Sequence, residues 1–320
     1  MSQGPLYQQG YKPQFSGHQT FPLRYGWLKK AYDAVVGTAS QTDNKNIFLD
    51  DGAIARFGVG KNMVASIRHW ANASGIIDEP KDSLVIRTTE LGNKLFGNNG
   101  LDQYMEHPAT LWLIHWNLAG VRTRKTTWFW AFSHFLSINF EREKIIKEIV
   151  RLAIDRSWSI SAGTTLKNDV ACFIRTYATQ KTGGQTRHED ALESPLTELK
   201  LIKTINRDHF YFVRGPKSTL GDGVFTYALL DFWNCVSSSS STLSFESIAY
   251  APGSPGRTFL LDENDVASYL SRLEVTTRGM LLWSETSGLR QVVRESSKKN
   301  KMLLSYIDRD FIIPAKRKVV

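Results

Sequence analysis

The stretch from Phe15 to Lys30 gathers side chains that could do chemistry on a phosphodiester or a nucleobase. One histidine, one arginine and two lysines stand there among four aromatic residues. Cations pair with phosphate oxygens, and aromatic rings stack on bases. His18 could transfer a proton, and Arg24 could hold a phosphate. We therefore expect His18 and Arg24 to form a catalytic pair and Lys29 to contact DNA.

An amphipathic helix over about residues 20–36 is expected to carry most of this stretch. Thr20 suits the N-cap and Pro22 the first turn. Leu23, Trp27, Leu28 and Ala31 would face inward. A capped helix accounts for these apolar residues, but it gives no structural reason for His18 or Arg24.

Residues 50–74 have the pattern of a helix-turn-helix. A short helix over 50–57 would meet a turn at Gly58–Gly60, followed by a longer helix over 61–74. Helical spacing of Met63, Val64, Ile67 and Trp70 supports the second helix, which could enter a major groove. Leu84–Thr88 could form a wing strand. The expected DNA contacts are Lys61, Asn62 and Arg68; the alternative is a helical hairpin with ordinary surface polar residues.

The middle of the chain repeats this pattern after a very apolar region. Residues 88–138 are expected to be helical and buried, with His115 and His134 as core histidines. A long amphipathic helix over 141–157 precedes a turn and a second helix over 165–177. Its polar candidates for DNA binding are Lys167, Asn168 and Arg175.

The last part of the chain predicts helices over 222–236, 245–250 and 262–273, and then two strands over 281–283 and 289–293 on either side of a turn at Ser287–Gly288. Three helices followed by a β-hairpin are the order of a winged helix. Arg257 closes a Gly-Ser-Pro-Gly turn that could present amides to an anion, although an ordinary turn is the simpler interpretation. The predicted organisation is an extended arm (1–14), a helix-turn-helix-like domain (15–96), a helical domain with a second such unit (97–180), a linker (181–190), a winged-helix-like domain (191–295) and a basic tail (296–320).

Composition favours a polyanionic partner such as double-stranded DNA. The chain of 320 residues has a formal net charge of +9 and a pI of about 9.4. Residues 290–320 hold nine Lys or Arg against three acidic residues, which suits either a phosphate-binding arm or a solvated terminus. Two isolated cysteines give neither a disulfide framework nor zinc-ligand spacing. With no signal peptide and no apolar run long enough for a membrane span, a cytoplasmic protein without membrane contact is expected.

Metal ligands are not evident in the sequence. Cleavage of a phosphodiester usually needs two or three carboxylates around a divalent ion. Asp190 with Glu198-Leu-Lys200 fits such a site loosely, but a charged amphipathic helix explains the segment better. The sequence also lacks a phosphate-binding loop of the Gly-Lys-Ser/Thr type.

Several motifs together resemble a bacterial family of SspB-like components of Ssp systems, which place phosphorothioate on one DNA strand. The resemblance covers most of residues 15–293 and lies in Phe15–Lys30, Gly58–Met63, Ile67–Trp70, Leu111–Trp116, Gly253–Arg257 and Ser287–Leu289. It implies a DNA-nicking role in phosphorothioation and phage defence, with dependence on Mg²⁺. It also implies partner proteins of the same system: a cysteine desulfurase, an ATPase and a sulfur-transfer component.

We therefore expect a mainly α, α+β chain built as an assembly of winged-helix and helix-turn-helix-like modules. The leading hypothesis is a Mg²⁺-dependent DNA nickase. The competing hypothesis is a non-catalytic DNA-binding adaptor or regulator, which the absence of a clear carboxylate cluster favours. The oligomeric state, a homodimer included, stays open.

Overall fold

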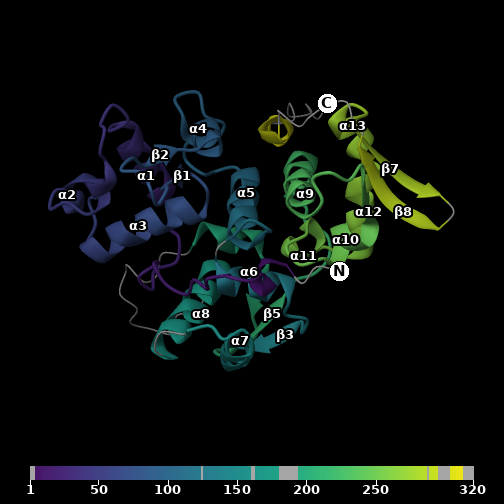
Figure 1. Ribbon diagram of the computed structural model, residues 1–320, viewed down its shortest axis with the longest axis horizontal. Coiled ribbons are helices and arrows are strands. Elements are labelled where there is room, and N and C mark those ends of the chain that lie inside the picture. The colour runs from purple at the N-terminus through teal and green to yellow at the C-terminus, as the bar shows by residue number, and fades with distance from the viewer. Residues whose placement is uncertain are drawn as a thin grey trace, which may run out of the picture.

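A computed structural model of the chain describes residues 4–123, 125–159, 163–179, 194–286, 288–294 and 303–312 (Figure 1). The α-helices are α1 (Trp27–Val36), α2 (Ala53–Phe57), α3 (Lys61–Ala73), α4 (Glu90–Phe96), α5 (Pro108–Ala119), α6 (Thr126–Ser133), α7 (Arg142–Asp155), α8 (Gly163–Tyr177), α9 (Asp222–Val236), α10 (Phe245–Tyr250), α11 (Pro255–Thr258), α12 (Glu263–Ser271) and α13 (Leu273–Thr277). Short 3₁₀ helices cover Pro5–Tyr7, Lys45–Phe48, Pro195–Leu199 and Leu303–Phe311.

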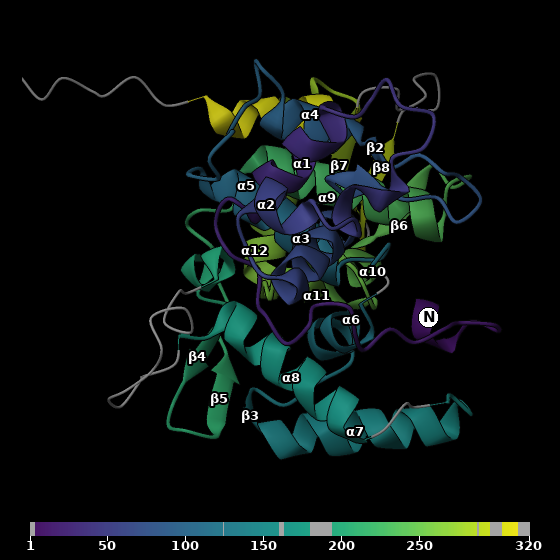
Figure 2. The ribbon, with the colours of Figure 1, turned by 90° about the vertical axis from the view of Figure 1, so that its left-hand side faces the viewer.

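The strands form small antiparallel sheets, which confirms the predicted α+β class. They are β1 (Ile77–Asp78), β2 (Arg87–Thr88), β3 (Asn139–Glu141), β4 (Ile202–Thr204), β5 (His209–Phe212), β6 (Thr242–Ser244), β7 (Leu281–Thr286) and β8 (Leu289–Arg294). In the described residues, β1 pairs with β2, and the two larger sheets have the orders β3-β5-β4 and β6-β8-β7. Figures 1 and 2 both place α7, α8 and the β3-β5-β4 sheet together at one end of the molecule.

Helices α5, α6 and α9 form the centre of the hydrophobic core. They are apolar on nearly every side, as a fully buried helix must be. The largest buried side chains include Trp112, Trp116, Trp128 and Trp233. His115 is buried among them and is hydrogen-bonded at both ring nitrogens, as expected of a core histidine. His134 is half-buried, and its Nε2 has no hydrogen-bond partner among the described residues.

The helix predicted over residues 20–36 is wrong over residues 20–26, which is about two turns. Helix α1 begins at Trp27, after Gly26 in a left-handed conformation, and Thr20 does not cap it. Thr20 itself has a φ of 67°, and its N–H donates to Nδ1 of His18. Residues 14–26, before α1, instead form an irregular segment, called the strap below. Residues far away in the sequence hold it in place through hydrogen bonds.

A short helix and a longer helix were predicted over residues 50–74, and α2 and α3 lie there with a turn between them. Gly58, at a φ of 64°, ends α2 in the left-handed region that glycine adopts without strain. Helix α3 follows two residues later and packs against α1. Strands β1 and β2 then form a small wing. That this unit is a winged helix-turn-helix stays a prediction.

The C-terminal 3₁₀ helix, Leu303–Phe311, packs along α9. Both Asp310 carboxylate oxygens accept backbone N–H groups at the start of α9, from Gly223 at 2.9 Å and Val224 at 2.6 Å. These N–H groups have no partner inside the helix, so Asp310 caps α9 from a distance of 87 residues along the chain.

Two of the features predicted from the sequence lie wholly or partly outside the described residues. The linker at 181–190 lies outside the described residues, and so does the tail at 296–320 apart from 303–312. The domain boundaries stay a prediction. None of the helices in the described ranges is both long and apolar enough to cross a membrane.

Candidate functional site

The strap before α1 is fixed through its backbone by α3, α6 and α8. Gln14 N–H donates to Thr126 Oγ1 at 2.8 Å, and Ser66 Oγ donates to the His18 carbonyl at 2.7 Å. The carbonyl of Phe21 accepts from Trp70 Nε1 at 3.0 Å. These contacts hold the strap against helices that are far apart in the sequence.

His18 lies at the centre of this strap and is buried. Its Nδ1 accepts the Thr20 N–H at 3.0 Å, which leaves Nε2 to donate to Asp169 Oδ1 at 2.8 Å. The other oxygen of Asp169 accepts from Thr127 Oγ1 at 2.5 Å. Both ring nitrogens of His18 are therefore engaged, and the tautomer is set by its two partners.

Lys125 brings a cation to the same buried group. Its side chain is 1% exposed, and Nζ lies 4.0 Å from Asp169 Oδ1 and 5.2 Å from the centre of the Trp128 ring. Nζ also donates to the Ser16 carbonyl at 3.5 Å. Burial lowers the pKa of the Lys125 ammonium, and the charge of Asp169 opposes that shift. An ammonium has three donors, so this buried lysine keeps capacity for a further acceptor.

His69 of α3 packs edge-on against His18, with ring centres 5.9 Å apart. Burial, and then the charge of Lys125, lowers the pKa of His69 well below its ordinary range. Only glycine fits at position 17 opposite this ring. A Cβ on Gly17 would lie 2.3 Å from His69 Nδ1, and the φ of 107° also favours glycine. The Ser-Gly-His sequence of the motif thus lets the strap pass close to α3.

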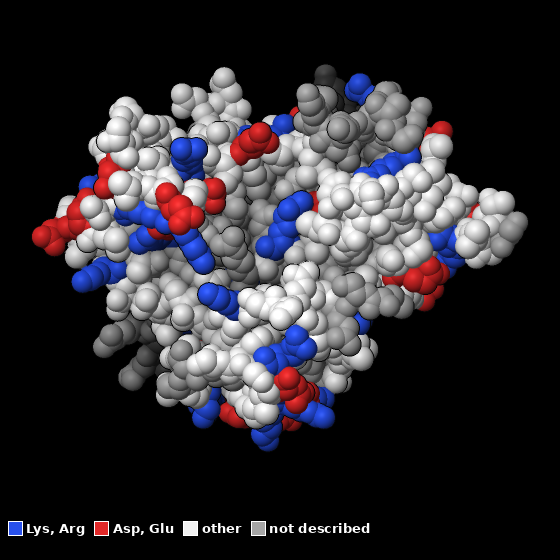
Figure 3. All heavy atoms as spheres, viewed as in Figure 1, with Lys and Arg blue, Asp and Glu red and all other residues white. Residues whose placement is uncertain are grey.

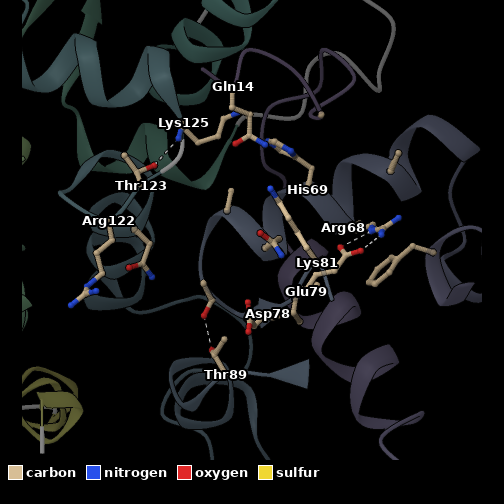
Figure 4. A pocket seen from close by; sticks show the side chains of 18 of the residues that line it. Gln14, Arg68, His69, Asp78, Glu79, Lys81, Thr89, Arg122, Thr123 and Lys125 are labelled. Carbon is tan, nitrogen blue, oxygen red and sulfur yellow. Dashed lines mark hydrogen bonds and ion pairs between the residues drawn. The ribbon is translucent and has the colours of Figure 1, made fainter. Parts of the chain in front are cut away.

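A polar cleft of about 760 Å³ opens beside this buried group. Its walls come from the strap, α3, the β1–β2 wing and the loop between α5 and α6 (Figure 4). Figure 3 shows the hollow in the middle of one face, with Lys and Arg side chains at its edges. The lining residues that carry charge or an amide are Gln14, Gln19, Arg68, Asn72, Asp78, Glu79, Lys81, Asn117, Arg122 and Lys125.

The cleft is positively charged, since four cations line it against two acids. Arg68 and Glu79 form a two-pronged pair, with Arg68 Nε donating to Oε2 at 3.0 Å and Nη2 to Oε1. Arg122 is anchored at Nε by the buried Asp231 of α9, although its side chain remains 60% exposed. Arg68 and Arg122 lie at opposite ends of the cleft in Figure 4, and Lys81 extends into it from the wing. Charge therefore runs along the whole length of the hollow.

The structure does not bring the expected catalytic pair into the cleft. Neither His18 nor Arg24 is among its lining residues. Arg24 is 9% exposed, and its guanidinium carbon lies 5.4 Å from the centre of the Phe21 ring and 5.5 Å from that of Trp27. Lys29 is half-buried and forms an ion pair with Asp33 at 2.5 Å.

Of the other expected DNA contacts, only Arg68 lines the cleft. Lys61 and Asn62 are exposed on the first turn of α3, outside it, and Lys167 and Asn168 are exposed on α8. Arg175 donates to the Thr20 carbonyl and so holds the strap. Arg257 donates from Nε to the Tyr250 carbonyl at 3.3 Å, and burial lowers its pKa.

The described residues do not form a complete magnesium site. Mg²⁺ takes oxygen ligands, usually one or two carboxylates with water. Both oxygens of Glu79 are paired with Arg68, and both oxygens of the fully buried Asp169 accept hydrogen bonds. Within the described ranges no group of three or more His, Cys, Asp or Glu could hold a metal ion. We therefore derive no chemical step through Mg²⁺.

Sequence reasoning missed Asp169, Thr127, His69 and Lys125 as parts of the site. Asp169 follows two polar candidates directly, but α8 turns it inward while Lys167 and Asn168 point outward. Lys125 stands in the loop between α5 and α6. Its signal was an ammonium placed directly before the apolar helix α6, where a buried cation needs a partner.

Comparison with known proteins agrees with the sequence resemblance. A family model described as a protein of unknown function (DUF4007) matches residues 15–309. A crystal structure of magnesium ion-bound SspB is similar with a TM-score of 0.76 and 26% identity, over 93% of this chain and 96% of that one. A second SspB crystal structure has a TM-score of 0.79 and 27% identity, over 93% and 88%. None of the curated proteins matches the chain. The expected SspB-like character is thereby confirmed.

Proposed function

The chain belongs to the DUF4007 family, and from this premise we propose that it is a DNA-binding component of an Ssp phosphorothioation system. The observation that carries the proposal is the cleft, in which four cations line one hollow. A phosphodiester chain supplies the negative charge that such a hollow attracts.

The anchoring of the cations supports a rigid grip on phosphate. Asp231 holds Arg122, and Glu79 holds Arg68, so neither guanidinium has to be ordered when a strand binds. Each guanidinium still has N–H groups beyond those used by its carboxylate. Lys81 is exposed and adds a further positive charge between them. In this proposal the cleft contacts replace most of the surface contacts expected at Lys61, Asn62, Lys167 and Asn168.

The finer proposal is that the bound strand is nicked with the help of Mg²⁺. A neighbour of known structure is described as magnesium ion-bound, which supports the ion but not its position here. Within this proposal His18 is a positioning residue, since both of its nitrogens are engaged and its bond to Asp169 fixes the strap. A proton-transfer role for His18, with Arg24 beside it, requires the strap to shift.

A second candidate function is a DNA-binding adaptor that holds the strand for other proteins of the system. The observation that favours it is the engagement of Glu79 by Arg68, which removes one of the two acids of the cleft from metal binding. The sulfur-supplying and ATP-hydrolysing partners, and a homodimer, belong to either version of the proposal.

The C-terminal part of the chain supports a winged-helix-like unit. Apart from the short helices α11 and α13, the element order α9, β6, α10, α12, β7, β8 and the sheet order β6-β8-β7 agree with three helices followed by a wing. Figure 1 shows β7 and β8 projecting from the body. We include this unit in the proposal as a scaffold that carries Asp231.

Incubation with supercoiled plasmid tests the proposal, with Mg²⁺ or with a chelator. Lys81→Gln is the cleft variant, and Lys61→Gln is its matched control, because it removes the same charge from an exposed position outside the cleft. Open-circular product that needs Mg²⁺ and is reduced by Lys81→Gln alone supports the nickase. Binding that depends on Lys81 without any cleavage supports the adaptor. If the protein does not retain DNA at low salt, both versions fail.

A further inference from the structure

Helix α3 is the helix that a helix-turn-helix would insert into a major groove, but here its polar face forms a wall of the cleft. Ala65, Arg68, His69 and Asn72 of α3 all line the hollow. The strap and the α5–α6 loop line it too, through Gln14, Gly17, Gln19, Arg122, Thr123 and Lys125, and Figure 4 shows Gln14 and Lys125 beyond His69. A recognition helix must instead protrude from the protein, because the groove closes around it.

The size of the cleft excludes a double helix and suits a small group. Its volume of about 760 Å³ lies within the ~300–1,000 Å³ of sites that enclose small ligands. A B-DNA duplex is too large to enter such a hollow, because its major groove alone is about 12 Å wide and about 8.5 Å deep. A single nucleotide is the part of DNA that matches the hollow.

The lining matches the two chemical parts of a nucleotide. Cations at both ends, Arg68 and Arg122, suit the phosphates that precede and follow an inserted residue. The walls also offer carboxamides, from Asn72, Asn117 and Gln14, which can donate to and accept from the edge of a base. Bases show that edge only when they are unpaired.

The buried cation Lys125 gives a second reason to expect an anionic ligand in the cleft. Lys125 lines the cleft, has capacity for another acceptor, and lies 4.0 Å from the only carboxylate near it in the described chain. A phosphate oxygen that approached Lys125 would offset the cost of burying its charge.

We propose that the cleft takes one unpaired nucleotide of a DNA strand, either single-stranded or extruded from a duplex. This inference rests on the proposed function and adds the state of the DNA that the site accepts. Paired DNA then contacts only the rim of the cleft.

Fluorescence anisotropy with three labelled DNAs of one sequence tests the inference. The DNAs are a single strand, its blunt duplex, and the duplex with a one-nucleotide bulge. Asn72→Trp fills the cleft without changing charge, and Lys167→Gln removes an exposed charge outside it. We expect the strand and the bulged duplex to bind at least tenfold more tightly than the blunt duplex. Asn72→Trp should abolish that preference, and Lys167→Gln should keep it.

The outcomes separate the inference from the proposed function. Equal affinity for all three DNAs, or a preference that survives Asn72→Trp in a protein with the wild-type circular dichroism spectrum, overturns the inference and leaves DNA binding in place. No binding to any of the three DNAs overturns the proposed function itself. A fluorescent base analogue at the bulge gives a second measure, since insertion into the cleft should change its emission in the wild type and not in Asn72→Trp.

Discussion

Nε2 of His18 donates a 2.8 Å hydrogen bond to Oδ1 of Asp169, and the two residues are 151 positions apart in the chain. The bond is fully buried and ties the strap to α8. Thr127 from α6 occupies the other oxygen of the same carboxylate. Three separate segments therefore depend on one acidic side chain to hold the wall of the cleft.

Asp169→Asn should destabilise the protein by about 3 kcal/mol, the cost of breaking a buried charged contact by removing one partner. Asparagine cannot accept at both positions, because its NH₂ faces either His18 or Thr127, and Lys125 loses its nearby anion. The free energy of unfolding in urea measures the effect. Asp33→Asn is the matched control. Its pair with Lys29 is exposed, so a change below about 0.5 kcal/mol is expected. Equal losses of unfolding free energy for the two variants would show that the buried network stabilises the protein no more than the exposed pair does.

Stability should fall as pH decreases from about 6.5 to about 4, partly through His115. Burial lowers the pKa of His115 from 6.5 to about 4, so the unfolded chain binds a proton in this range and the folded chain does not. At about 1.4 kcal/mol for each pKa unit, His115 alone accounts for a loss of about 3 kcal/mol. Burial also lowers the pKa of His134 to about 4, which adds to the slope in the same direction.

His115→Gln should remove the His115 part of this pH dependence while preserving its contacts. His115 accepts from the Tyr177 hydroxyl at Nδ1 and donates from Nε2 to the Thr258 carbonyl, both at 2.8 Å, and a glutamine carboxamide offers the same acceptor and donor. Unfolding curves measured from pH 7 to pH 4 should be flatter for the variant. A slope identical to that of the wild type would contradict the assignment to His115.

The C-terminal 3₁₀ helix should detach from α9 when Asp310 is removed. Asp310→Ala leaves the N–H groups of Gly223 and Val224 without their acceptor, at a cost of about 1 kcal/mol by analogy with helix N-caps. Hydrogen exchange at these two amides should become faster. Asp308→Ala is the comparison, because Asp308 pairs with Lys94 at a half-exposed position and does not contact α9 N–H groups. Unchanged exchange in Asp310→Ala would rule out this capping role.

Local patterns were enough to predict much of the fold. Helix α9 covers the predicted residues 222–236, and α10 covers 245–250. The hairpin of β7 and β8 was expected from its turn at Ser287–Gly288 and its alternating apolar residues. In each case the signals for start, period and end lie within the element itself.

Long-range contacts decided the parts that could not be predicted. Residues 20–26 have capping signals for a helix, but Gly17, Gln19 and Thr20 take positive φ angles because His18 is drawn to Asp169. Strand β3 pairs with β5 across about 70 residues, and the sequence around Asn139 does not predict which strand it pairs with. The site has the same limitation. The motif identified His18 as unusual, yet the cleft beside it is built by α3, the wing and the α5–α6 loop. No local sequence pattern predicts that these three segments lie next to one another.

Asp231 should affect DNA binding only through Arg122. Asp231 is buried in α9 and holds the Nε of Arg122, whose exposed side chain lines the cleft. On the proposed function, Arg122→Gln should weaken binding to a single strand about tenfold, which is about 1.4 kcal/mol. Asp231→Asn should weaken binding by a similar factor, because the guanidinium is no longer held in place. It retains an oxygen that can accept from Trp116 Nε1, now bonded at 3.0 Å, so the core contact survives.

The double variant distinguishes positioning from a separate contribution of Asp231. If Asp231 acts by orienting Arg122, the variant with both substitutions should bind no more weakly than Arg122→Gln alone, since the two effects share one contact. Anisotropy titrations of the four proteins at one salt concentration give the coupling energy. Repeating them at several salt concentrations adds a second criterion. The slope of log Kd against log salt should fall by about one for Arg122→Gln. It should not fall further in the double variant. Additive losses would mean that Asp231 affects DNA binding by another route, such as a shift of α9, and the positioning role would have to be abandoned.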